Sequence, residues 1–227
     1  MSIFARIKMR IKSLIDKYSR YVRDRNEKKH LQQLRDKNKN KQCTIICNNC
    51  VGGVIYHNLG MRFDSPTINL SIRGEDYLEF CKNFKYYMSC DLVENQIEVT
   101  ADYPIGTLVP QDDQHIPIKI HFEHYKTFAE AKSKWMERCR RVDYENIYFI
   151  WEFYDTKYDF RLASEFDNLP VKHKMILTHN KFPEIKNGCY ISCYVEDKPV
   201  AKILEYNGRS GKRYLDEFDY VGFINRE

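Results

Sequence analysis

The 227-residue sequence lacks a long uninterrupted apolar run. Its best candidate, residues 144–154, is broken by charged side chains and is much shorter than the ~20 residues that span a bilayer. The N-terminus also lacks the apolar centre of a secretion signal. We therefore expect a cytoplasmic protein. The eight cysteines are few and often fall on apolar faces, which predicts buried free thiols rather than a secreted disulfide framework.

Several catalytic motifs are also missing. There is no Gly-x-Ser-x-Gly elbow, no His-Glu-x-x-His and no Walker motif, so common hydrolases and nucleoside triphosphatases lose support. No Asp-x-Asp stands at a predicted strand end, where metal-dependent glycosyltransferases usually carry one. The sequence predicts no metal site and identifies no cofactor.

Charge is distributed unevenly along the chain. Residues 1–42 hold 14 Lys or Arg and 4 Asp or Glu, a net charge of +10, whereas the remainder carries −5. Apolar residues of this arm recur at three- and four-residue steps, which predicts an amphipathic cationic helix. The stripe consists of Phe4, Ile7, Ile11, Leu14, Ile15, Tyr18 and Val22. From residue 26 to 42 apolar residues thin out, which predicts fraying into a polar linker.

We place the boundary near Lys41, so that residues 1–41 form the basic arm and linker and residues 42–227 form a single domain. The arm suits an anionic membrane surface, which residues 1–25 would bind at the inner face of the membrane. Alternatively, the stripe packs on the acidic domain, or on the arm of another copy in a homo-oligomer. Both interpretations remain open. We do not expect nucleic acid as a partner, because the domain is acidic and shows no base-reading motif.

After the arm, β-rich segments alternate with helical patterns, which predicts an α/β fold with a mostly parallel sheet and helices on both faces. The predicted strands cover residues 43–47, 67–72, 116–122, 147–153, 174–178 and 189–195. The predicted helices cover residues 51–59, 75–87, 128–142, 160–168 and 212–223. Residues 102–115, rich in Pro and Asp, are predicted as a long loop or hairpin.

Two further blocks of the sequence belong together. The first reads Cys-Asn-Asn-Cys-Val-Gly-Gly-Val-Ile-Tyr at residues 47–56, followed by Leu59-Gly60 and Ser65-Pro66-Thr67. The second comprises His124-Tyr125, Phe128, Glu130-Ala131, Trp135 and Arg138. With these blocks the chain resembles, over about residues 42–225, a family of uncharacterised bacterial proteins named as exopolysaccharide biosynthesis proteins. The resemblance implies a cytoplasmic enzyme or accessory factor of cell-surface polysaccharide assembly, such as a transferase acting on a sugar nucleotide or lipid-linked sugar. It transfers no catalytic residues.

Cys43, Cys47 and Cys50 have the spacing of iron–sulfur ligands in radical-SAM enzymes. A strand over residues 43–47 would hold the first two ~13 Å apart, too far to share a cluster. Cys47 and Cys50 also form a C-x-x-C before a predicted helix. However, no cis-proline partner segment is evident, and the two Asn between them are typical of helix capping. We favour buried strand cysteines.

Asn48, Asn49, Gly52 and Gly53 are the first predicted ligand-binding residues. The Asn pair ends the first strand and can cap the next helix, while the glycines let backbone approach a ligand closely. Ligands of parallel α/β sheets bind outside the carboxyl ends of strands. A tight structural turn without a ligand is the open alternative.

His121, Glu123 and His124 follow the apolar alternation of residues 116–122. Strand parity would place His124 on the apolar face and the other two on the opposite face. His121 and Glu123 would then lie about 7 Å apart, where the carboxylate could raise the pKa of this imidazole toward the working pH for acid–base catalysis. At this strand end we predict Glu123 and His124 as the proton-transfer residues. A purely structural histidine is favoured for His121 and stays an open alternative for His124.

Two more positions complete the predicted site. His179 closes strand 174–178 while Glu152 lies late in strand 147–153, so both fall at the same sheet edge, and we predict that His179 binds ligand. Arg138 lies three residues after Trp135 on one helical face. We expect it to help pack that helix and to reach an acidic partner or the phosphate of a ligand.

Overall fold

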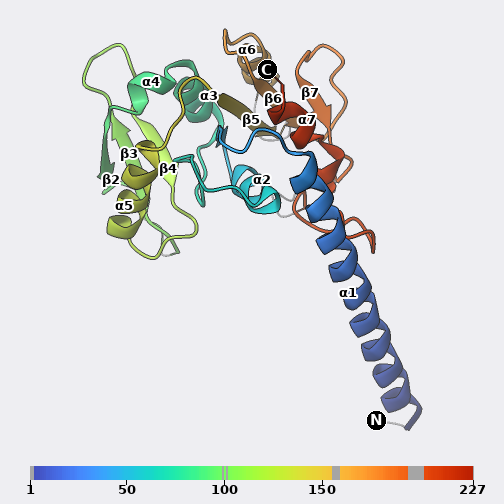
Figure 1. Cartoon of the computed structure of the whole chain (residues 1–227). Helices are drawn as coiled ribbons and strands as arrows, with labels where there is room; N and C mark the ends of the chain where they lie inside the picture. The colour runs from blue at the N-terminus through green and yellow to red at the C-terminus, as the bar shows by residue number, and fades with distance from the viewer. Residues whose placement is uncertain (1–2, 99, 101, 155–158, 194–201, 227) are drawn as a thin grey trace.

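The computed structural model describes residues 3–98, 100, 102–154, 159–193 and 202–226 (Figure 1). The described strands form a four-stranded parallel sheet in the order β1-β5-β6-β7 and a three-stranded antiparallel sheet in the order β2-β3-β4. A long helix precedes them. The predicted α/β class, with a mostly parallel sheet behind an N-terminal helix, is confirmed.

The parallel sheet comprises β1 (Thr44–Cys47), β5 (Ile147–Phe153), β6 (Lys174–Thr178) and β7 (Gly188–Tyr190). The antiparallel sheet comprises β2 (Asp91–Glu94), β3 (Ile105–Val109) and β4 (Ile118–His121). The helices are α1 (Ile3–Lys37), α2 (Val51–Leu59), α3 (Gly74–Lys82), α4 (Phe84–Tyr87), α5 (Phe128–Cys139), α6 (Phe160–Asp167) and α7 (Tyr220–Ile224), with a 3-10 helix η1 (Tyr214–Glu217).

The parallel sheet separates two cores. Along β5, Phe149, Trp151 and Phe153 pack with α3, α6 and the antiparallel sheet. Tyr148 and Ile150 face the other way, toward α2, η1 and α7. This division follows from the two-residue period of a strand, and it explains why β5 reads as an almost continuous apolar run. Helical layers on both faces confirm the predicted arrangement.

The predicted strand 67–72 is wrong, because this segment is mostly irregular and forms a single bridge, between Ser71 and His121. Its side chains satisfy neighbouring backbone instead: the Thr67 hydroxyl accepts a hydrogen bond from the Cys47 N–H at 3.0 Å. The strand predicted at 116–122 exists as β4 but pairs antiparallel with β3, which lies within the predicted loop or hairpin at 102–115. Part of the strand predicted at 189–195 lies outside the described residues.

The first half of α1 projects from the body, and its second half packs against the body (Figure 1). Glu27 accepts a hydrogen bond from the Tyr206 hydroxyl at 2.8 Å, and the Arg35 guanidinium donates to the Asn58 carbonyl at 2.8 Å. The fraying predicted after residue 26 is therefore wrong, since α1 continues unbroken to Lys37. Within the described residues, no helix combines the length and apolarity required to cross a membrane.

Candidate functional site

The two asparagines after β1 tie this strand to β5. The Asn48 side chain pairs with the backbone of Glu152 through two hydrogen bonds. Its amide nitrogen donates to the Glu152 carbonyl at 3.1 Å, and its oxygen accepts from the Glu152 N–H at 2.9 Å. The Asn49 side-chain oxygen accepts from the Val51 N–H at 3.0 Å, which forms an Asx turn into α2. Its amide nitrogen donates to Glu152 Oε2 at 2.6 Å. Both asparagines therefore organise the carboxyl edge of the sheet.

Glu152 is the centre of a buried polar network. Only 1% of its side chain is exposed, yet its carboxylate receives three hydrogen bonds. The donors are the Asn49 amide, the Tyr154 hydroxyl at 2.5 Å and His179 Nε2 at 3.1 Å. A buried carboxylate requires such compensation, because desolvation of an uncompensated charge costs several kcal/mol or more.

His179 connects Glu152 to Cys193. Its Nδ1 lies 3.5 Å from Cys193 Sγ, and the Tyr154 ring stacks on the imidazole with 5.1 Å between centroids. Burial lowers the pKa of His179, but the contacts with Cys193 and Glu152 outweigh it and raise this pKa to about 9. At neutral pH the imidazole is therefore protonated and can donate from both nitrogens.

Each strand of the parallel sheet contributes to this network in turn. Asn49 follows β1, Glu152 lies in β5, His179 follows β6 and Cys193 follows β7. Strand parity places these side chains together, because Glu152 continues the face of Tyr148 and Ile150. In the same way, His179 continues the Met175/Leu177 face and Cys193 continues the Ile191 face.

A second polar group lies at the amino end of α2. Cys50 Sγ is 3.2 Å from His124 Nε2, while the Glu123 carboxylate accepts a hydrogen bond from the Ser71 hydroxyl at 2.8 Å. His124 and Glu123 are both exposed, and each contacts a different partner. The alternation of strand faces predicted for Glu123 and His124 does not apply, because β4 ends at His121. The chain then turns, and the Tyr125 N–H donates a hydrogen bond to the Phe122 carbonyl.

Segment 71–72 brings this turn to α2, although β4 belongs to the antiparallel sheet. Ser71 exchanges both backbone hydrogen bonds with His121, and the next residue, Ile72, donates to the Asn48 carbonyl at 2.9 Å. His124 thus contacts Cys50, the residue that follows the Asn48/Asn49 pair, through a connection that no sequence pattern indicated.

The thiols of the C-x-x-C are protonated at neutral pH. Burial raises the pKa of Cys47 to about 12, and Cys47 Sγ lies 3.5 Å from the Asn49 side-chain oxygen, to which it donates. Burial also raises the pKa of Cys50 to about 11, with Glu123 and Glu152 adding to the shift. Cys50 therefore experiences the charge of the buried network as well as its contact with His124.

His121 does not behave as a carboxylate-activated base. It is 4% exposed, and its Nδ1 is buried without a hydrogen-bond partner. Burial lowers its pKa, and the neighbouring Arg73 lowers it further. The prediction that a carboxylate raises the imidazole pKa is wrong at this position, because desolvation dominates.

Other predicted residues contact the protein itself. A Cβ on Gly52 would lie 3.0 Å from Cys47 Cβ, so glycine lets α2 approach β1 closely. A Cβ on Gly53 would make ordinary contact with Ile68 at 3.7 Å. The Arg138 guanidinium donates to the Tyr125 hydroxyl at 2.7 Å and to the Ile68 carbonyl at 3.1 Å, and thereby holds α5 on segment 63–68.

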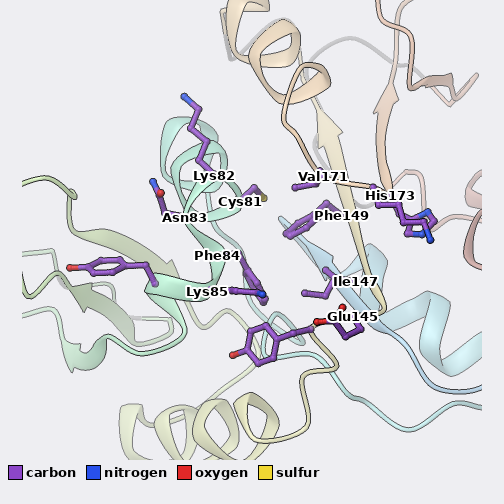
Figure 2. Close-up of a pocket in the computed structure, with 13 residues that line it drawn as sticks. Cys81, Lys82, Asn83, Phe84, Lys85, Glu145, Ile147, Phe149, Val171 and His173 are labelled. Atoms are coloured by element: carbon purple, nitrogen blue, oxygen red, sulfur yellow. The ribbon is translucent and has the colours of Figure 1, made fainter.

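A cavity of 450 Å³ opens at the opposite, amino-terminal edge of the parallel sheet (Figure 2). Phe84, Ile147 and Phe149 supply apolar walls, and Lys82 and Lys85 lie among its other lining residues. None of the predicted site residues lines it. Because ligands of parallel sheets bind at the carboxyl ends of strands, we take the Glu152 network and the Cys50/His124 contact as the candidate site. Among the described residues, no group of His, Cys, Asp and Glu fits a metal ion.

Cys193 and Tyr154 are site residues that the sequence interpretation missed. Cys193 was predicted only as one of the buried free cysteines. The available signal was that Glu152, His179 and Cys193 all stand at the ends of apolar alternations.

The sequence matches the family described as a domain of unknown function (DUF1919) over residues 19–225. An uncharacterized protein of Haemophilus influenzae is 35% identical over 218 residues, which make up 95% of this chain and 97% of that protein. The family match begins within α1, and so extends further toward the N-terminus than the resemblance predicted from residue 42. This chain belongs to the DUF1919 family.

Proposed function

We propose that the chain is an enzyme of cell-surface polysaccharide assembly that transfers an acyl group to a hydroxyl of a sugar nucleotide or lipid-linked sugar. The sugar class is supported by the resemblance carried by residues 47–67 and by the block from His124 to Arg138. The reaction class is supported by one observation, the hydrogen-bonded row Cys193–His179–Glu152. A nucleophile, a base and a group that orients the base form the usual set for acyl transfer.

The row assigns a role to each member. Cys193 is the nucleophile, His179 exchanges the proton, and Glu152 fixes the orientation of the imidazole. Asn49 and Tyr154 hold the Glu152 carboxylate in place. Cys50 is the weaker candidate nucleophile, because its raised pKa keeps it a thiol at neutral pH.

The proposed reaction balances in two steps. Cys193 Sγ attacks the carbonyl carbon of an acyl thioester, an S–C bond forms, and the donor's own C–S bond breaks while His179 relays the Cys193 proton to the departing sulfur. A sugar hydroxyl then attacks the acyl-cysteine, a C–O bond forms, and the C–S bond to Cys193 breaks while His179 relays the hydroxyl proton to Cys193. The starting Cys193–His179 pair is restored, and no oxidant or metal is required.

The exposed contact of Cys50 with His124 is the proposed entry for the acceptor. It lies at the carboxyl edge, one residue along the chain from Asn49, which contacts Glu152. His124 presents a hydrogen-bonding imidazole at the surface, as recognition of sugar hydroxyls requires.

The test is acylation of the full-length protein by acetyl-coenzyme A, a soluble acyl thioester, followed by addition of a panel of sugar nucleotides. We expect mass spectrometry to place an acetyl group on Cys193, and acceptor addition to discharge it. Cys193→Ser should lose this labelling. His179→Gln should slow it roughly 100-fold, the usual contribution of a general acid or base.

Cys189→Ser is the matched control, because Cys189 lies in β7, four residues before Cys193, and makes no contact with His179 among those described. We expect it to acylate at the wild-type rate. Acetylation that persists in Cys193→Ser, or a panel of short and long acyl thioesters that never labels Cys193, would overturn the acyl-transfer proposal.

A second candidate function is a non-enzymatic binding module that docks through its arm. The exposed apolar side chains of α1 favour it, since they offer a contact surface remote from the Glu152 network. It differs from the first in one outcome, because a module of this kind shows no turnover of any acyl donor.

A further inference from the structure

The first half of α1 exposes an apolar stripe. Ile7, Ile11, Leu14, Ile15 and Tyr18 recur along one side of the helix, and between 49% and 66% of each residue is exposed. Buried cores normally hold such side chains, and a contiguous exposed set marks a contact surface.

The domain does not cover this stripe, because it lies on another side of the helix from the packed face. Arg23, Asn26, Glu27 and His30 contact the C-terminal part of the chain. At 100° per residue, the centre of this contact face is rotated by roughly 130° from the centre of the stripe. The stripe is therefore directed away from the face that α1 presents to its own domain, along the projecting half seen in Figure 1.

The charged residues beside the stripe indicate which kind of surface it binds. Lys8 lies on one flank, and Arg10 and Lys17 lie on the other. The acidic Asp16 falls near the opposite side of the helix. An apolar stripe bordered by cations matches an anionic bilayer surface, where acyl chains receive the apolar side chains and headgroups receive the cations.

A second copy of α1 fits this pattern less well. Paired helices place flanking residues close to those of the partner, and opposite charges there stabilise the pair. Here the flanks supply cations from both helices, so self-association would bring like charges together. Nucleic acid would use the cations but leave the apolar stripe uncovered.

We propose that residues 7–22 of α1 form a peripheral membrane-binding helix that docks the domain on anionic lipid. This inference does not depend on the acyl-transfer proposal, and the two can fail separately.

The test is flotation of the full-length protein with vesicles of phosphatidylcholine mixed with phosphatidylserine, and with vesicles of phosphatidylcholine alone. We expect salt-sensitive flotation with the mixed vesicles only. The double variant Ile11→Gln/Leu14→Gln, which leaves the net charge unchanged, should lose it. The triple variant Lys8→Gln/Arg10→Gln/Lys17→Gln should weaken vesicle binding roughly 100-fold, since each cation near an anionic surface contributes about fivefold.

The matched control is Met9→Gln/Ser13→Gln, which places the same side chains on the opposite side of the helix. It should float like the wild type. The proposal is overturned if Ile11→Gln/Leu14→Gln floats undiminished, or if flotation with the two kinds of vesicle is equal. It is also overturned if no flotation occurs while sedimentation shows a dimer that dissociates in Ile11→Gln/Leu14→Gln. A second copy of the chain would then cover the stripe.

Discussion

At the scale of single residues, the notable feature is a charged pair in a place where charge is costly. Glu152 and His179 are 1% and 4% exposed, and pairs buried this deeply rarely stabilise a fold relative to apolar residues of the same shape. Such a pair, with a cysteine on its far side, is better explained by chemistry than by folding. It nevertheless makes stability depend on pH.

The raised pKa of His179 fixes the direction of that dependence. Its pKa rises from 6.5 in the unfolded chain to about 9 in the fold, so the stabilisation is complete below about pH 6.5 and disappears as pH rises through about 9. We expect the free energy of unfolding to fall between pH 6.5 and about 8.5, with a slope approaching ~1.4 kcal/mol per pH unit. Urea denaturation at several pH values measures it.

His179→Gln is the control for this dependence. The variant should be less stable at pH 7, because Glu152 loses its charged partner, and its free energy of unfolding should fall less steeply across the same range. In the unfolded chain thiols have a pKa of about 8.5, so the buried cysteines add to the slope above about pH 7.5 in both proteins, and the difference between the two slopes belongs to His179. An equally steep slope in the variant would contradict the assignment to His179.

Replacement of His124, unlike that of His179, should affect ligand binding and leave stability almost unchanged. His124 is exposed and its described contact is with Cys50, so His124→Ala should change the free energy of unfolding by less than about 0.5 kcal/mol. If His124 receives the acceptor, the same variant should abolish acceptor binding, seen by calorimetry, and raise the acceptor KM, while His179→Gln lowers kcat. His57→Ala is the control, because His57 is an exposed histidine in the nearby helix α2. Unfolding of His124→Ala would make His124 structural.

At the scale of elements, sequence patterns predicted some segments well. The predicted bounds of α2, β5 and β6 agree with the structure, because each is a distinct apolar segment that ends at polar or turn-forming residues. By contrast, β2 was not predicted, since its four residues are mostly exposed and show no apolar alternation. The antiparallel pairing of β4 depends on β3, whose residues lie among the turn-forming residues of 102–115.

The candidate site shows the same division. Strand ends at Asn49, Glu152 and His179 could be placed on one edge, because parallel strands end together. The hydrogen bonds between these residues could not be predicted, because they depend on the strand order β1-β5-β6-β7, which no local sequence pattern encodes. The contact of Cys50 with His124 depends on the bridge between Ser71 and His121, which joins two sheets.

One glycine controls how α1 attaches. Gly211 has φ +77°, and a Cβ there would lie 2.2 Å from the Glu27 backbone nitrogen. Gly211→Ala should therefore push α1 from turn 206–213. Gly208→Ala is a matched control, since Gly208 has φ +70° with open space around it. Both variants should lose about 1–2 kcal/mol from the left-handed backbone, and Gly211→Ala about 1–3 kcal/mol more from overpacking. Equal losses in chemical denaturation would contradict the contact.

At the scale of the whole molecule, α1 divides into a half that belongs to the body and a half that does not. Leu34 packs on the core beside α2, His30 lies 2.8 Å from Asp216, and Arg35 bonds to the end of α2. The family match, which begins at residue 19, starts close to this division. We therefore expect the boundary of the arm near Val22, within the helix.

Two truncations test this division. A chain that begins at Val22 keeps the packed half of α1, so its free energy of unfolding should equal that of the full-length protein. A chain that begins at Gln42 loses the contacts of Glu27, His30 and Arg35 and uncovers the core beside Leu34. At about 1 kcal/mol for each hydrogen bond, and more for the uncovered apolar surface, it should lose roughly 3 kcal/mol or more.

The same pair of truncated chains separates the two proposed activities of the molecule. The chain beginning at Val22 should keep acylation of Cys193 and lose flotation, because the stripe is removed while the Glu152 network and the packed half of α1 remain. The chain beginning at Gln42 is unsuitable for flotation, since it would lose stability together with the stripe. Equal stability of the two truncated chains in urea would show that the second half of α1 contributes nothing to the fold, and the arm would then end at residue 41 as the charge distribution alone suggests.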